Sequence, residues 1–544
     1  MAKNLLNKSW LHVVIIILLG VLLYCYNISG WDLWNPDEPR YAQVAREMAE
    51  TGTWMLPHLN GNVYHEKPPL VYWLVGLSFK VFGACTESTA RFPIALLSVL
   101  VLVMTYVFGK TLFDPLTAFI SSLILATNVE FFWLSRRLAL DIPLALCILL
   151  SFISFSRGYK NEARKGIYYA AFFIFMGLGT LAKGPVGFIL PLFTVILYLL
   201  LKGEVRRLKE MRFGTGTLLF LMTLLAWLVP AALQGGKAYF QEIVFHQTVN
   251  RFFDAWAHHQ PFYYYFEVFS AGFLPWIIFL PAAFICSFQA WRGKKEGGDF
   301  LFPLVWFIVV FGFFTFSKGK RELYLLPLYP AAAMITGKLW ADYFAGQENS
   351  FVKRYMNISL FILVCSMLIA GIVPFFIQAK FSKLLESAPH VSFIPITVFF
   401  FMTALLLFLF RRRKIAYFTL IVMMMICGML YAVSSILPTL NPLKSAKPIS
   451  REIISLMKPG DELVIYKKEP SAFNFYTGIY PIKEVKTQED LIRLFTSEKR
   501  IFCLIVAGDY KKVKNSLAGA YPLKEADIGH REFLLVSNRS MVQQ

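Results

Sequence analysis

Residues 92–109 read FPIALLSVLVLVMTYVFG, and residues 116–134 read LTAFISSLILATNVEFFWL. The first stretch carries no charge, and the second carries only Glu130. Both lengths are close to the roughly 20 residues that a helix needs to cross the hydrocarbon core of a bilayer. Only the segment KTLFDP separates the two stretches. The pair therefore predicts two neighbouring membrane-spanning helices.

The rest of the chain repeats this pattern. Of its 544 residues, 57% are hydrophobic and only 16% are charged. Soluble domains have about 25% charged residues, so a string of such domains is excluded, and we predict an all-α polytopic membrane protein. About thirteen apolar runs are candidate spans: residues 11–29, 92–109, 116–134, 138–156, 167–182, 184–201, 218–233, 265–288, 300–316, 323–340, 358–377, 393–410 and 415–437.

The positive charge predicts an orientation. The formal net charge is +20, which in a soluble protein would suggest a nucleic-acid partner. Here Lys and Arg concentrate in every second connection, and cytoplasmic loops of membrane proteins are rich in these residues. We therefore expect a cytoplasmic N-terminus, an uncleaved first span and no nucleic acid. The connections concerned are residues 157–165, 202–212, 292–295, 353–354 and 411–414.

The last hundred residues change in character. With an odd number of spans, the segment from residue 438 to 544 is expected outside the cytoplasm. Short β-rich runs at residues 462–466, 501–507 and 532–537 alternate with helical patterns at 449–457 and 491–497. We therefore predict a membrane domain over residues 1–437, followed by a small soluble α/β domain over residues 438–544.

Two long external loops are too polar to cross the bilayer, residues 31–91 and 234–264. The first opens with WNPDEPRY, in which Asn35 is expected as the helix N-cap and Pro36 as the first helical residue. Asp37 would then lie at the positive end of the helix dipole and be ionised. Either Asp37 and Glu38 only cap this helix, or Asp37, just outside the first span, serves a reaction at the membrane surface.

The buried face of that helix is expected to run through Tyr41, Val44 or Ala45, and Met48. A second acid, Asp141, lies in the apolar sequence LALDIP at the external end of a predicted span. An ionisable residue there is a functional candidate. The alternative is a helix cap, or a partner for Arg136 or Arg137.

Cations on the external side need a reason other than the orientation rule. A group of Lys and Arg side chains at this depth suits a phosphate, which charge-assisted hydrogen bonds can hold, and the alternative is contact with lipid headgroups. Lys67 and Arg251 are the better candidates because they lie in the two long loops. The full set is Lys67, Arg136, Arg137, Lys183, Arg251, Lys318, Lys320 and Arg321.

Several motifs in order along the chain resemble one known family. They include NPDEPRY from Asn35, YHEKPP from Tyr64, LAKG from Leu181, LPW from Leu274 and SKGK from Ser317. Together they resemble the lipid A 4-amino-4-deoxy-L-arabinose transferases, which are related to protein O-mannosyltransferases. The chain departs from the common pattern at Pro69-Leu70 and at Lys320-Arg321-Glu322.

The resemblance implies a GT-C glycosyltransferase of the bacterial inner membrane, with its C-terminal domain in the periplasm. Its donor would be a sugar on undecaprenyl phosphate, its acceptor lipid A or another glycan, and a monomer in the lipid bilayer is expected. Asp37 and Asp141 match the acids near the sugar, and Glu38 is kept as a third catalytic candidate. The resemblance gives carrier-phosphate binding to Lys67, Arg251, Tyr324, Tyr64 and Tyr41.

Glu66 and His246 resemble the ligands of a structural zinc ion, and no organic cofactor is expected. Three other functions stay open. A related GT-C enzyme would move a hexose, a uronic acid or mannose to core oligosaccharide, glycan or protein. A transporter or lipid-flipping protein would be expected to have paired repeat halves, which the sequence lacks. A non-catalytic protein that binds through its C-terminal domain is distinguished by whether that domain can be deleted without loss of transfer.

Overall fold

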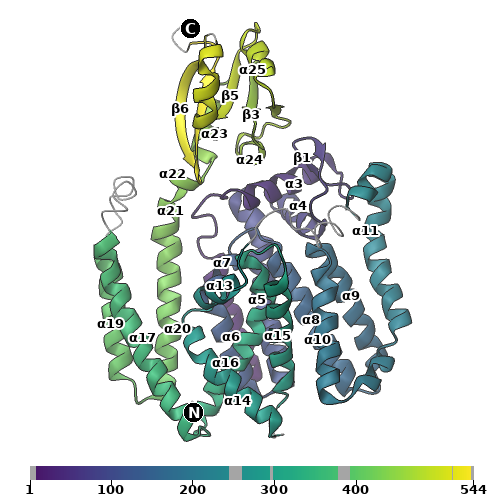
Figure 1. Ribbon diagram of the computed structural model, residues 1–544, viewed down its shortest axis with the longest axis vertical. Coiled ribbons are helices and arrows are strands. Elements are labelled where there is room, and N and C mark those ends of the chain that lie inside the picture. Colours follow the sequence, from purple (N-terminus) through teal and green to yellow (C-terminus); the bar gives the residue numbers. More distant parts are fainter. Residues whose placement is uncertain (1–7, 244–259, 294–297, 378–392, 518, 541–544) are drawn as a thin grey trace.

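The computed structural model describes residues 8–243, 260–293, 298–377, 393–517 and 519–540. Each predicted apolar run contains helix (Figure 1). The principal helices of the bundle are α2 (Ser9–Cys25), α5 (Glu87–Leu112), α6 (Pro115–Ala126), α7 (Val129–Ser135), α8 (Asp141–Lys160), α9 (Lys165–Lys183), α10 (Val186–Lys202), α11 (Phe213–Gln241), α13 (Tyr264–Gly272), α14 (Leu280–Arg292), α15 (Leu301–Phe316), α16 (Tyr329–Phe344), α17 (Ser350–Ile377), α19 (Phe393–Leu409) and α20 (Lys414–Tyr431).

Not every apolar helix is long enough to cross a membrane. Among the described residues, six helices are long and apolar enough to cross a membrane, or eight if two bent pairs each form one span. Five further apolar helices are shorter, among them α2, α10 and α15. The chain thus has the mostly helical architecture predicted for a multi-pass membrane protein, and the count of thirteen spans stays a prediction.

Two predicted spans are bent rather than straight. Within residues 116–134, helices α6 and α7 meet at 69°. Asn128 is fully buried there, accepts a hydrogen bond from the Phe131 amide at 2.9 Å and so starts a new helix. Within residues 265–288 the bend is 110°, and Pro275, which has no amide hydrogen, precedes the second half.

Helix α3 (Asp37–Thr51) crosses the end of the bundle (Figure 1). Tyr41, Val44, Ala45 and Met48 are all buried, as the spacing predicts. The prediction that Asn35 is the N-cap is wrong. Pro36, which has helical backbone angles, directly precedes the helix, so Asn35 lies outside the first turn. No side chain caps the start of the helix. The helix ends at Gly52, whose φ of 74° places it in the left-handed region.

After α3 the external loop continues with a hairpin and one more apolar helix. Strands β1 (His58–Leu59) and β2 (Asn62–Val63) pair antiparallel. Helix α4 (Leu70–Phe82) follows and packs against α3 and α5. Figure 1 shows α3, α4 and the hairpin at one end of the bundle, while the connection between α19 and α20 lies at the other end.

The C-terminal segment folds into a mixed sheet with strand order β4-β3-β5-β7-β6. Strands β3, β4 and β5 are parallel, whereas β7 and β6 add antiparallel. Alternate side chains of β3 and β5 fill two separate cores, one on each face, as the period of two requires. The strands are β3 (Glu462–Tyr466), β4 (Lys483–Val485), β5 (Ile501–Val506), β6 (Tyr521–Ile528) and β7 (Arg531–Ser537), with helices α23 (Lys447–Leu456), α24 (Ser471–Thr477), α25 (Gln488–Phe495) and α26 (Ala507–Val513).

The sheet region is held to the first external loop by buried polar contacts. Asn60, at the tip of the hairpin, donates to the Ile482 carbonyl at 2.9 Å and accepts from the Ile482 amide at 2.7 Å. Its backbone amide in turn donates to Glu47 of α3 at 2.7 Å. Arg46 donates to the Phe475 carbonyl at 3.2 Å. Helix α3 is thus fixed by the sheet region at one end and by the bundle at the other.

Candidate active site

Asp37, the first residue of α3, lies between two arginines. Its Oδ1 accepts from Arg40 at 2.7 Å, and its Oδ2 accepts from Arg321 at 2.6 Å. The side chain is 15% exposed. Burial acts to raise the pKa of Asp37, but the charges of Arg321, Arg40 and Arg137 hold that pKa below its ordinary value. The carboxylate is therefore an anion, as its place at the helix start also favours.

Glu38 is next in sequence but points into the protein core. It is 1% exposed, and Arg91 donates to both of its oxygens at 2.8 and 3.0 Å. The backbone amides of Leu138 and Trp34 donate to it as well, at 3.0 and 3.3 Å. Burial opposes ionisation, yet Arg91 and Arg137 lower the pKa of Glu38 below its ordinary value. This arrangement ties α3 to α5 and to the start of α8.

Arg40 links Asp37 to the segment after the hairpin. It lies one turn after Asp37 and also reaches Glu66 at 3.4 Å. Tyr64 donates to the same Glu66 oxygen at 3.4 Å. Lys67 follows Glu66 directly, so its backbone lies at the edge of this group. Burial raises the pKa of Tyr64, and its hydroxyl is therefore a neutral donor.

Tyr41 lies on the side of this group that faces α4. It is 4% exposed, and its ring centroid lies 5.9 Å from that of Tyr72. Arg40 lies over the Tyr41 ring at 5.5 Å. Burial, with Asp37 beside it, raises the pKa of Tyr41, which leaves the hydroxyl neutral.

Asp141 forms a second acid-base pair. It is 2% exposed and makes an ion pair with Lys183, the last residue of α9. Lys183 also lies 4.3 Å from the ring centroid of Tyr324, in the short 3-10 helix η4 (Glu322–Leu328). Arg321 and Asp37 interact electrostatically with both members of the pair. Asp37, Asp141, Lys183, Arg321 and Tyr324 therefore share one site.

The alternative prediction, that Asp141 pairs with Arg136 or Arg137, is wrong. Arg136 is fully buried, donates to backbone carbonyls of Leu23, Tyr26 and Asn27, and lies over the Trp31 ring. Arg137 approaches Glu38 at 3.6 Å. Both arginines thus contact protein groups, and the alternative that external cations reach lipid headgroups stays a prediction.

Two predicted site residues, Arg251 and His246, lie outside the described residues. The described part of the chain contains no group of three or more His, Cys, Asp and Glu side chains that could hold a metal ion. Glu66 accepts from Arg40 and Tyr64 there, so zinc has no support from that part. Among the described residues, His65 of the first long loop approaches Glu242 of the second at 3.6 Å.

Three members of the site were not among its predicted residues. Arg40 has the spacing of one helical turn from Asp37, which is a signal for an ion pair but does not distinguish it from a surface pair. Lys183 and Arg321 are external cations near span ends, and the charge pattern flags both. Their partners lie 42 and 284 residues away, so sequence spacing gives no indication of the pairing.

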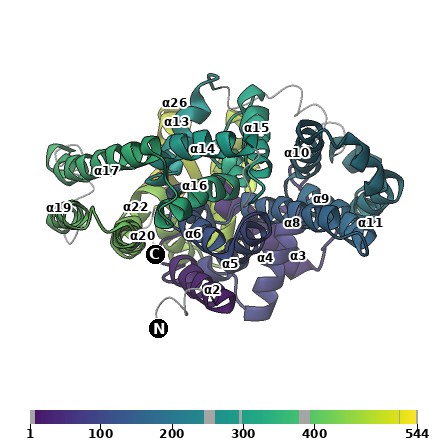
Figure 2. The same cartoon turned by 90° about the horizontal axis from the view of Figure 1, so that it is seen from below.

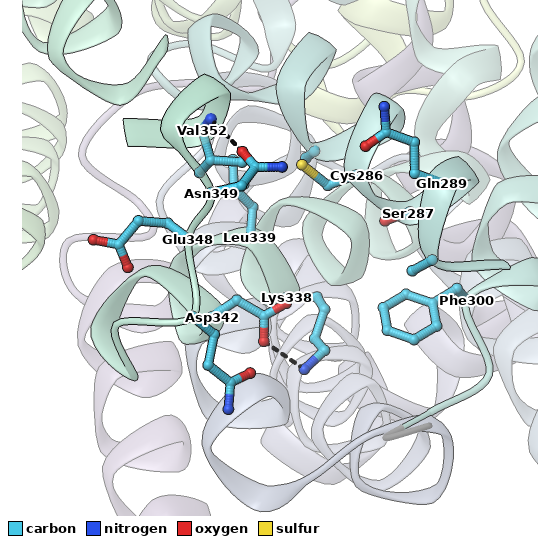
Figure 3. Close-up of a pocket in the computed structure, with 13 residues that line it drawn as sticks. Cys286, Ser287, Gln289, Phe300, Lys338, Leu339, Asp342, Glu348, Asn349 and Val352 are labelled. Carbon is cyan, nitrogen blue, oxygen red and sulfur yellow. Dashed lines mark hydrogen bonds and ion pairs between the residues drawn. The ribbon is translucent and has the colours of Figure 1, made fainter. Parts of the chain in front are cut away.

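A cavity of about 260 Å³ lies elsewhere, at the end of the bundle away from α3. It is formed by α14, α16 and the start of α17, and Lys338 and Asp342 make an ion pair at 2.7 Å on its wall (Figure 3). None of the candidate site residues lines it. Figure 2, which views the molecule from below, shows α17 and α19 extending away from the main bundle.

The chain is similar to known proteins along most of its length. Residues 9–241 match the family described as dolichyl-phosphate-mannose-protein mannosyltransferase. A protein of Aquifex aeolicus that is described as uncharacterized is 32% identical over 70% of this chain and 71% of its own length. Undecaprenyl phosphate-alpha-4-amino-4-deoxy-L-arabinose arabinosyl transferase 2 of Sodalis glossinidius is 31% identical over 67% of each chain.

Solved structures show the same fold. ArnT from Cupriavidus metallidurans, bound to undecaprenyl phosphate, superposes with a TM-score of 0.81 over 97% of this chain and 98% of that chain, at 20% identity. An oligosaccharyltransferase of Archaeoglobus fulgidus gives a TM-score of 0.53 over 95% and 71%, at 15% identity. These likenesses establish the GT-C fold, and the sequence relatives establish the family. The chain belongs to the undecaprenyl phosphate-α-4-amino-4-deoxy-L-arabinose arabinosyl transferase family, and is a glycosyltransferase that depends on a polyprenyl-phosphate sugar.

Proposed function

We propose that this enzyme moves 4-amino-4-deoxy-L-arabinose from undecaprenyl phosphate to a phosphate of lipid A, on the periplasmic face of the inner membrane. The observation that carries the proposal is the group of three cations and two acids where α3 meets the bundle. Arg40, Arg321 and Lys183 are gathered there with Asp37 and Asp141. The names of the relatives support the sugar.

The donor phosphate would be bound by Lys67 and Arg251, with Tyr324, Tyr64 and Tyr41 beside it. Negative charge grows on this phosphate as its bond to the anomeric carbon breaks. Fixed cations in a poorly hydrated site stabilise that charge, and losing one such group typically costs about 3 kcal/mol of barrier, or roughly a hundredfold in rate. The neutral hydroxyls of Tyr64 and Tyr41 can donate to phosphate oxygens without adding negative charge.

The proposal gives each of the three acids a different role. Asp37 would face the sugar and balance the positive charge that develops at its anomeric carbon. Asp141, whose charge Lys183 neutralises, would position the groups around the sugar. Glu38 would act through structure only, since Arg91 and two backbone amides occupy its carboxylate.

The arrangement in the cell belongs to the same proposal. Residues 1–437 would form the membrane domain of a monomer, with the N-terminus in the cytoplasm and residues 438–544 in the periplasm. The basic connections support this orientation, because α3 and the sheet lie at the end of the bundle opposite the α19–α20 connection, which contains Arg411 to Arg413.

A second candidate function is transfer of mannose or another hexose to protein or glycan. It is favoured by the match of residues 9–241 to dolichyl-phosphate-mannose-protein mannosyltransferases. The two candidates predict different products. Mass spectrometry of lipid A from cells with and without the gene should show a gain of one aminoarabinose per modified phosphate. Unchanged lipid A, together with a new hexose on protein or core glycan, would support the second candidate.

A further inference from the structure

The cavity between α14, α16 and the start of α17 lies apart from the candidate active site. Its volume is about 260 Å³. A single buried water needs only about 10–15 Å³, so the cavity has room for a small polar group. Figure 3 shows Ser287 and Gln289 of α14 on one wall, and Asp342 of α16 and Asn349 on the opposite wall.

Two polar side chains on the wall can accept further hydrogen bonds. Ser287 is only 4% exposed. Other buried serines of the bundle, such as Ser121 and Ser151, donate to the carbonyl one turn earlier, whereas the Ser287 hydroxyl has no partner in the described part of the chain. Asp342 accepts from Lys338 through Oδ1 at 2.7 Å, and its Oδ2 has no partner among the described residues. A ligand that donates hydrogen bonds would satisfy both groups.

The charges around the cavity cancel one another. Lys338 pairs with Asp342, and Lys414 pairs with Glu348. The side chains of Lys338 and Asp342 are only 13% and 24% exposed, so a single charge added beside them would lack a compensating charge. A zwitterion adds no net charge. Its anionic part can meet Lys338, which also lies 5.8 Å from the ring centroid of Phe300, and its cationic part can meet Asp342.

Large apolar side chains are exposed next to the cavity. Ile285 and Phe288 of α14 are 42% and 47% exposed, and Phe351 of α17 is 44% exposed. Exposed apolar groups of this kind mark contact with a membrane. The cavity lies at the end of the bundle away from α3, where Lys414 follows a basic connection. In the proposed orientation this end meets the cytoplasmic leaflet.

We propose that the cavity binds a zwitterionic phospholipid headgroup with a primary ammonium, the chemistry of phosphatidylethanolamine, from the cytoplasmic leaflet. Its phosphate would meet Lys338, and its ammonium, which has three N–H donors, would meet Asp342 and Ser287. The acyl chains would lie against Phe288 and Phe351. Phosphatidylcholine has the same charges but no N–H donor, and phosphatidylglycerol has a net negative charge. The inference does not depend on the sugar or the acceptor of the proposed function.

The test measures lipid binding to the purified full-length enzyme in detergent, after bound lipid has been removed. Phosphatidylethanolamine, phosphatidylcholine and phosphatidylglycerol with identical acyl chains are added separately. Native mass spectrometry gives the Kd of the first bound lipid in each titration. The wild type should bind phosphatidylethanolamine at least about tenfold more tightly than the other two lipids, because a hydrogen bond to a charged group is typically worth about tenfold or more in affinity.

Two variants assign the binding to this cavity. Asp342→Asn removes the carboxylate and leaves Lys338 without its partner, so phosphatidylethanolamine should bind about tenfold more weakly and phosphatidylglycerol more tightly. Ser287→Leu fills the cavity without changing a charge and should also lower the affinity for phosphatidylethanolamine by about tenfold. It keeps the proposal testable if Asp342→Asn does not fold, which thermal unfolding checks.

Lys353→Gln is the matched control for charge. It removes an exposed cation of α17 that does not line the cavity, and it should leave the preference for phosphatidylethanolamine over phosphatidylcholine unchanged. Glycerophosphoethanolamine, the headgroup without acyl chains, tests for a soluble ligand. It should bind at least about a hundredfold more weakly than the lipid, because it buries no acyl chain.

Three results would overturn the inference. The first is equal affinity of the wild type for the three lipids. The second is a wild-type preference that persists in either folded variant, Asp342→Asn or Ser287→Leu. The third is glycerophosphoethanolamine binding as tightly as the lipid, which would make the cavity a site for a soluble ligand. None of these results bears on sugar transfer, for which the candidate residues lie at the other end of the bundle.

Discussion

Asp37 and Glu38 are neighbours in the first turn of α3, yet they lie in two different regions of the molecule. Glu38 faces the core, where Arg91 and backbone amides surround it and 1% of it is exposed. Asp37 faces the site, where two arginines hold it and 15% of its side chain is exposed. Both carboxylates have a lowered pKa and arginine partners. The comparison teaches that an ion pair alone does not identify a site residue, because both acids have one and they differ in which part of the molecule they face.

The largest effect should come from the core-facing pair. Arg91→Ala leaves Glu38 buried without its partner, and breaking a buried pair on one side costs about 3–5 kcal/mol of stability. Thermal unfolding in detergent and the amount of folded protein in membranes measure the loss. Lys165→Ala, which removes a partly exposed cation, should leave both unchanged. Normal stability of Arg91→Ala would contradict the structural role of Glu38.

A change at Asp37, the acid that faces the site, should lower activity far more than stability. Asp37→Asn keeps the size of the side chain but removes the charge that we propose balances the positive charge on the sugar, so transfer should fall by roughly a hundredfold, or about 3 kcal/mol of barrier. Unfolding should change far less than for Arg91→Ala. Activity is measured with purified enzyme, lipid A and mass spectrometry. If Asp37→Asn unfolds as readily as Arg91→Ala, the two regions do not differ in the way that exposure indicates.

A smaller effect is expected at the far end of α3, where the sheet region holds the hairpin. Asn60→Gly removes three side-chain hydrogen bonds while tolerating the positive φ of 55° at this position. The loss should be about 1–3 kcal/mol, because buried partners are left unsatisfied. Urea or thermal unfolding measures it. Asn62→Ala, at the exposed side of the same turn, is the control and should have little effect.

The smallest effect should come from Tyr64, at the edge of the site. Tyr64→Phe removes the hydroxyl that donates to Glu66 and keeps the ring. The free energy of unfolding should therefore fall by about 0.5–1.5 kcal/mol. If the hydroxyl also helps bind the carrier phosphate, KM for the donor should rise in addition to this loss of stability. A kcat lowered as far as in Asp37→Asn would instead give Tyr64 a direct part in the chemical step.

Much of the fold could be predicted from the sequence, because periodicity depends on local burial. Strand β3 has the bounds that its pattern predicts, and helix lies in each of the thirteen apolar runs. Strand β6 was not predicted, since most of its side chains are exposed and the pattern lacks a buried face. The bend at Asn128 was missed because the polar residues Thr127, Asn128 and Glu130 are too few to interrupt the hydropathy of the apolar run.

The site could be predicted only in part. Asp37, Asp141 and Tyr324 are brought together as the resemblance implies, and the family is confirmed. The residues that hold the two acids could not be predicted, because Arg321 reaches Asp37 across 284 residues and Lys183 reaches Asp141 across 42. Charge pattern identifies cations that need a partner. Only the fold determines which acid each one meets.

The central claim, that the site at the start of α3 transfers sugar from a polyprenyl phosphate, is tested most directly by reconstitution. Purified enzyme, undecaprenyl-phosphate-linked aminoarabinose and lipid A are incubated together. The mass of the lipid A product is then measured by mass spectrometry. The wild type should add the sugar, and the folded Asp37→Asn variant should add it at about one hundredth of the rate. A folded Asp37→Asn enzyme as fast as the wild type would contradict the claim.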